Sequence, residues 1–115
     1  MSDFEQMMAE LQVEYLTALP QRLIQMAEQL AVQNVSALRE EFHKLKGTGK
    51  TYGLPEISEL CEVAERICLE RPQHVADAVP RALNLLRQIH KARINKSVVS
   101  LAEQSEFSQI KKCLS

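Results

Sequence analysis

Five residues on one face of a predicted helix have the types and spacing to hold a negatively charged group. A helix over about residues 36–53, with ~100° of rotation per residue, puts Lys46, Gly47 and Lys50 on the same side as His43. Arg39 lies one turn earlier on this side. Imidazole is neutral and nucleophilic near neutral pH, and the cations beside it attract negative charge. Because glycine adds no bulk, we expect a histidine that another protein can reach.

The other face of the same helix is apolar and predicts burial. Its residues recur with the i, i+4, i+7 spacing of a core-facing stripe. Gly49 belongs to this stripe and costs about 1 kcal/mol of helix stability relative to alanine, which suggests that a neighbouring helix packs close to it. The stripe consists of Leu38, Phe42, Leu45, Gly49 and Tyr52.

The residues around the histidine form the motif His43-x-Leu45-Lys46-Gly47-Thr48, with Gly53 ten positions after the histidine. This motif resembles the signature of histidine-containing phosphotransfer (HPt) domains of multistep phosphorelays. The resemblance extends over about residues 4–94.

The overlapping run of residues 47–51 imitates the end of a nucleotide-binding P-loop, but a lysine stands where that loop needs its first glycine.

The resemblance implies a role for each polar residue of this face. His43 would accept a phosphoryl group from the phospho-aspartate of a receiver domain and pass it to another receiver. Lys46 would contact the phosphoryl oxygens, and Gly47 would let the receiver approach. Lys50 adds a second positive charge, and Arg39 is either a contact for an acidic receiver surface or a solvated charge. No cofactor is expected in this chain, since Mg²⁺ would belong to the partner receiver.

The expected partners are response-regulator receiver domains, one of them in a hybrid sensor histidine kinase. The chain would be a phosphoryl carrier without autokinase activity. The alternative from another class is a non-catalytic helical adaptor that binds a receiver without accepting phosphate.

Composition limits the other possibilities. The 115 residues favour one domain, and a net charge of −1 argues against nucleic-acid binding. The amino terminus has no signal-peptide pattern, and no stretch reaches the ~20 apolar residues of a membrane span. Three cysteines without a CxxC spacing fit a reducing compartment. We therefore expect a cytoplasmic protein, monomeric and without membrane contact.

Four amphipathic segments predict an all-α, antiparallel (up-down) four-helix bundle with an N-terminal helical extension. The first covers residues 4–32, with Asp3 as its cap, and is either bent or broken at Pro20. The second ends at Gly53, and the third begins with Pro55. The fourth runs from about residue 77 to residue 95, with Pro80 in its first turn.

The predicted bundle occupies residues 1–95, and residues 96–115 form a C-terminal tail or an extra helix. The apolar residues of this tail fall on two separate faces. A docked helix, a partner-binding tail and a frayed end all remain open for it.

Overall fold

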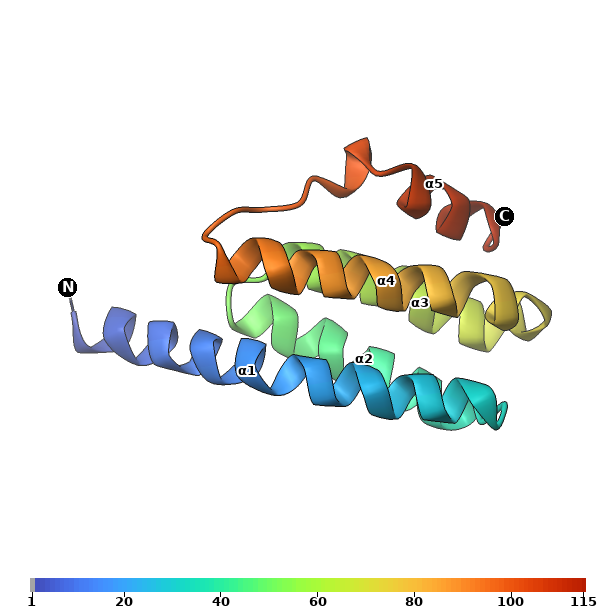
Figure 1. Cartoon of the computed structure of the whole chain (residues 1–115), viewed down its shortest axis with the longest axis horizontal. Coiled ribbons are helices and arrows are strands. Elements are labelled where there is room, and N and C mark those ends of the chain that lie inside the picture. Colours follow the sequence, from blue (N-terminus) through green and yellow to red (C-terminus); the bar gives the residue numbers. More distant parts are fainter. Residues whose placement is uncertain (1) are drawn as a thin grey trace.

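The computed structural model describes residues 2–115. Four long helices pack antiparallel around one core, which confirms the predicted all-α bundle (Figure 1). Two 3₁₀ turns and a short fifth helix complete the described chain. The elements are α1 (Asp3–Ala31), α2 (Val35–Thr51), α3 (Pro55–Glu70), η1 (Pro72–His74), α4 (Val75–Ile94), η2 (Leu101–Glu103) and α5 (Ser105–Lys112).

The apolar stripes read from the sequence form the core. In α2, Leu38, Phe42 and Leu45 are fully buried and hold the helix against its neighbours. Tyr52 is only half-buried, and its ring packs edge-on against Tyr15 with the centroids 5.8 Å apart. Burial of each large apolar side chain contributes about 1.5–3 kcal/mol. The opposite face of α2 is therefore fixed toward solvent.

The first two helices begin with side-chain caps. The hydroxyl of Ser2 accepts a hydrogen bond from the Glu5 N–H at 3.1 Å. The prediction of Asp3 as the cap is wrong, because the extended backbone of Ser2 lets its hydroxyl reach the first turn while Asp3 is already helical. At α2, the Asn34 side chain accepts a hydrogen bond from the Ala37 N–H at 3.1 Å.

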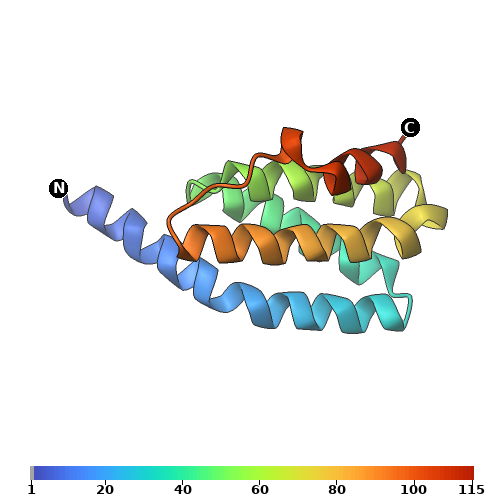
Figure 2. The same cartoon turned by 45° about the horizontal axis from the view of Figure 1, so that its top comes forward.

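Helix α1 continues through Pro20 but changes direction near it (Figure 2). Proline has no N–H, so the Leu16 carbonyl loses its usual partner four residues later. His90 of α4 replaces that partner, since its Nε2 lies 2.9 Å from the Leu16 carbonyl oxygen. Of the two sequence alternatives, the structure therefore shows one bent helix.

A tight turn sets α2 antiparallel to α3. Gly53 has a φ of +74°, a left-handed conformation that glycine adopts without strain. The Leu54 N–H donates to the Gly49 carbonyl at 2.8 Å, and the Gly53 N–H donates to the Lys50 carbonyl at 3.4 Å. These two bonds make a Schellman ending, and Pro55 then starts α3 as predicted.

Helix α4 begins at Val75, two residues before the predicted start. Pro80 therefore lies inside the helix and not in its first turn, because η1 leads directly into α4 and supplies an extra half-turn. Near the other end of α4, Arg93 binds Glu56 of α3 through two hydrogen bonds of 2.6 and 2.7 Å. This nearly buried pair ties the two helices together.

The C-terminal segment folds back as a docked helix. Helix α5 packs on α4 and α3 (Figure 1). Arg81 of α4 and Glu106 of α5 form an ion pair at 2.9 Å beside this contact. The division of the chain at residue 95 stays a prediction. The buried residues of the segment are Leu101, Phe107, Ile110 and Cys113.

Within residues 2–115, none of the helices combines the length and apolar character that crossing a membrane requires.

Candidate functional site

His43 lies in the middle of α2 on its solvent side. Its side chain is 65% exposed, while Phe42 and Leu45 beside it in sequence are buried. The helix is therefore a rigid support that presents the imidazole to an approaching molecule.

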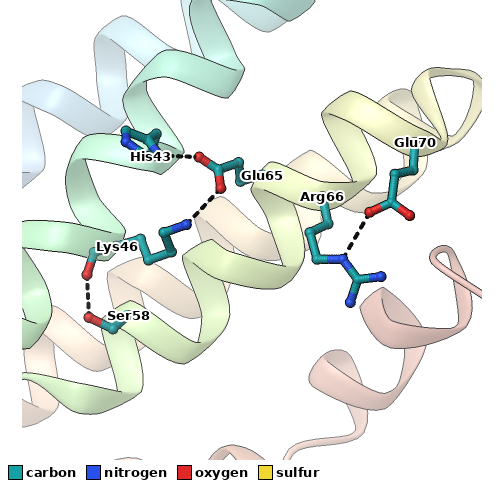
Figure 3. Close-up of polar contacts among 6 residues, drawn as sticks. All are labelled: His43, Lys46, Ser58, Glu65, Arg66 and Glu70. Carbon is teal, nitrogen blue, oxygen red and sulfur yellow. Dashed lines mark hydrogen bonds and ion pairs between the residues drawn. The ribbon is translucent and has the colours of Figure 1, made fainter.

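A carboxylate from α3 connects the histidine to a lysine (Figure 3). Glu65 places one oxygen 2.5 Å from His43 Nδ1 and the other 2.8 Å from Lys46 Nζ. A carboxylate only accepts, so we assign the ring proton to Nδ1, and the Nε2 lone pair is left unprotonated. The arrangement orients the ring and keeps its second nitrogen available as a nucleophile.

Glu65 remains ionised in this position although its side chain is only 9% exposed. Burial alone raises the pKa of its carboxyl group, but the hydrogen bonds from Lys46 and His43 outweigh that effect and lower it below the ordinary value. The same hydrogen bond to Glu65 raises the pKa of Lys46. One negative charge is thus shared between an ammonium group and an imidazole.

Close packing between α2 and α3 brings Glu65 to the histidine. A Cβ placed on Gly49 would lie 3.1 Å from both Ile57 and Ser58, so only glycine allows this approach without displacement. The Ser58 hydroxyl also donates to the Lys46 carbonyl at 2.5 Å, across the same contact. The close helix packing that the sequence suggested at Gly49 is therefore present between α2 and α3.

Gly47 borders an open groove on the C-terminal side of the histidine. A Cβ on this glycine would meet no atom within 4 Å. Lysines from α2 form one wall, and acidic residues from α3 form the other. The lining residues are Lys46, Gly47, Lys50, Pro55, Ser58, Glu59 and Glu62.

The other two predicted residues stand further from the ring. Lys50 is exposed on the groove. Arg39 is half-exposed one turn before His43 and makes no ion pair among residues 2–115. Its positive charge lowers the pKa of the Cys68 thiol, although burial of that thiol dominates and raises its pKa to about 11.

Glu65 was missed by the sequence reasoning. A signal for it existed, because Glu65 falls four residues after Cys61 and three before Cys68, at the edge of the buried stripe of α3. A carboxylate at such a position needs a partner, and the motif face of α2 supplies two.

Comparison with known protein families matches residues 10–95 to the Hpt domain. The chain belongs to the Hpt domain family. Hpt domains transfer phosphoryl groups through a histidine in phosphorelays, interact with receiver domains and act as phosphocarriers and not as classical enzymes. No curated protein and no solved structure matches the chain significantly.

Proposed function

We propose that this Hpt domain accepts a phosphoryl group on Nε2 of His43 from a receiver phospho-aspartate and passes it to an aspartate of another receiver. One receiver would belong to a hybrid sensor kinase. The observation that carries the proposal is the hydrogen bond from His43 Nδ1 to Glu65, which leaves Nε2 of the exposed imidazole as the nucleophile.

The chemistry of the step follows from this geometry. The Nε2 lone pair forms the N–P bond as the P–O bond of the acyl phosphate breaks, and the carboxylate of the receiver leaves. The ring gains positive charge as the bond forms. Glu65, 2.5 Å from Nδ1, stabilises that charge or takes the Nδ1 proton. Glu65 is therefore a positioning residue that also balances charge, and transfer to the next receiver reverses the step.

Lys46 supports the phosphoryl group by binding it as a second partner beside Glu65. In the structure its ammonium binds Glu65 and is one-third exposed. A transferring phosphoryl spreads negative charge over three equatorial oxygens, which compete with the carboxylate for this cation. Lys46 then bridges Glu65 and the phosphoryl group. Mg²⁺ would come with the receiver.

The groove beside Gly47 supplies the approach for the receiver. A partner backbone can reach the histidine over a position that carries no side chain. Lys50 contributes positive charge within the groove, and Arg39 does so one turn before the ring. We assign these two residues to receiver binding and not to the chemical step.

The proposal includes neither autokinase activity nor a bound nucleotide. The P-loop-like run at residues 47–51 lies inside α2. Its backbone N–H groups therefore serve the helix and cannot surround phosphates as a loop would. The cysteines of the described chain are free, which suits a cytoplasmic location.

A labelled-transfer assay tests the proposal. The protein is mixed with a phosphorylated receiver, and we expect acid-labile, base-stable label that the His43→Gln substitution abolishes. His74→Gln is the matched control, since His74 is also exposed but lies outside the site, and it should retain the label. Absence of label with several receivers that nevertheless bind would favour the adaptor alternative.

The roles of the neighbours can be separated in the same assay. Lys46→Ala should slow transfer on the order of a hundredfold while the helical spectrum stays intact. Lys50→Ala is the control, because this lysine is further from the ring, and it should weaken receiver binding more than it slows transfer at saturating receiver. A bulky residue at position 47, as in Gly47→Leu, should reduce receiver affinity. Unchanged rates or affinities would remove the assigned roles.

A further inference from the structure

The first turns of α1 extend past the end of the α2–α3 hairpin (Figures 1 and 2). Gln12 donates from its side chain to the Tyr52 carbonyl at 2.8 Å, so residue 12 lies beside the C-terminal end of α2. Residues 3–11 continue beyond that point. The match to the Hpt domain begins at residue 10, so most of this projecting segment lies outside the family region.

One side of the projecting segment is apolar and uncovered. Phe4 is 66% exposed and Met7 is 49% exposed, while Met8 and Leu11 are half-exposed. Their spacing of three and four residues puts them on one face of α1, in line with Tyr15, which packs against Tyr52. The face that α1 turns toward α2 thus continues after α2 has ended. We call Phe4, Met7, Met8 and Leu11 the projecting stripe.

The charged side chains on this part of α1 all have one sign. Residues 2–21 contain four acidic side chains, those of Asp3, Glu5, Glu10 and Glu14, and no lysine or arginine. Two copies paired through their stripes would bring these carboxylates together, which is unfavourable. An anionic membrane surface would repel them too. A partner with positive charge beside its apolar surface complements both features.

We propose that the projecting stripe docks an apolar helix flanked by lysine or arginine residues from another protein. The projecting stripe is a single helical face, which fits the apolar face of another helix. The carboxylates beside it favour a partner helix that carries lysine or arginine next to its apolar face. The partner helix would lie in the position that a longer α2 would occupy.

This surface is separate from the phosphotransfer site. Along α2, Tyr52 lies nine residues beyond His43, and along α1, Phe4 lies eight residues beyond Gln12, which contacts Tyr52. A helix rises about 1.5 Å per residue, so Phe4 lies roughly 25 Å along the bundle from the histidine. A domain of about 100 residues has a radius of gyration of about 13 Å, which corresponds to an outer radius of about 17 Å for a compact sphere, so a receiver centred on His43 leaves Phe4 accessible. The proposal therefore does not depend on phosphorylation of His43.

The test uses the full chain and synthetic helical peptides. The probe is a fluorescent peptide of about 18 residues with a leucine stripe and lysine flanks, long enough to form a stable helix on contact. Comparison peptides carry the same stripe with glutamate flanks, or the same composition with the stripe scrambled. Fluorescence anisotropy at physiological ionic strength measures each affinity.

We expect the leucine–lysine peptide to bind and both comparison peptides to bind about tenfold more weakly or worse. The Phe4→Ser, Met7→Ser double substitution should weaken binding by about tenfold or more. Val13→Ser is the matched control, since Val13 is 63% exposed on another face of α1, and it should bind as the wild type does. All these side chains are exposed, so circular dichroism should show an unchanged fold.

Three results would overturn the proposal. They are equal binding by the double variant, equal binding of the glutamate peptide, and a wild-type dimer in sedimentation that the double substitution abolishes. The last result would assign the stripe to a second copy of this chain.

Discussion

Two glycines two residues apart in α2 should respond differently to the same added methyl group. Gly47 and Gly49 both lie inside the helix, so alanine at either position removes the same backbone penalty of about 1 kcal/mol. What differs is the space around the new Cβ. At Gly47 it meets no atom within 4 Å, whereas at Gly49 it lies 3.1 Å from Ile57 and Ser58.

The stability change caused by Gly49→Ala depends on whether Ile57 and Ser58 can move away from the new Cβ. Ile57 is β-branched and fully buried, so its methyl group has little freedom to withdraw. Ser58 is held by its hydrogen bond to the Lys46 carbonyl. Overpacking of this kind costs about 1–3 kcal/mol. Gly49→Ala should therefore be neutral to about 2 kcal/mol destabilising, while Gly47→Ala should be about 1 kcal/mol stabilising.

Urea unfolding followed by circular dichroism measures both variants against the wild type. The two free energies of unfolding should differ by about 1–3 kcal/mol, with Gly47→Ala the more stable. If Gly49→Ala gains as much stability as Gly47→Ala, the α2–α3 contact is looser than the distances indicate. The reasoning about how Glu65 reaches the histidine would then fail with it.

Three further predictions concern polar side chains and their partners. His90→Leu should lower the free energy of unfolding by about 1–3 kcal/mol, because it leaves the Leu16 carbonyl unpaired. The loss should be smaller in a Pro20→Ala background, where the N–H of residue 20 can pair with that carbonyl. Equal losses in the two backgrounds of this double-mutant cycle would show that His90 does not replace the missing N–H. Glu56→Gln should cost about 2–3 kcal/mol because it leaves the charge of the nearly buried Arg93 without a counter-charge and removes one of its two acceptor oxygens. Arg66→Gln in an exposed pair should have little effect in the same urea titration. The pKa of Glu65 is lowered by folding, so its stabilising contribution is complete above the ordinary value of 4.5 and is lost as the pH falls below it. The stability difference between wild type and Glu65→Gln should therefore shrink in acid, and a difference that is constant with pH would contradict this.

Much of the fold follows from local rules that a sequence displays. The stripe of α2 is buried at Leu38, Phe42 and Leu45, and Gly53 ends the helix in the left-handed conformation expected of it. The first residue of a helix follows less directly from the sequence, since Ser2 caps α1 in place of the predicted Asp3. A cap depends on the backbone angles of a single residue, and neighbouring polar residues compete for the role.

The sequence by itself determined which residues of α2 share a face, because helical periodicity is a property of the chain alone. It therefore predicted His43 beside Lys46 and Gly47, within a motif of the Hpt family. Only the tertiary structure decided that Glu65, 22 residues later on another helix, holds both the ring and the ammonium group. That contact depends on the separation and rotation of two packed helices, which periodicity within one helix cannot specify.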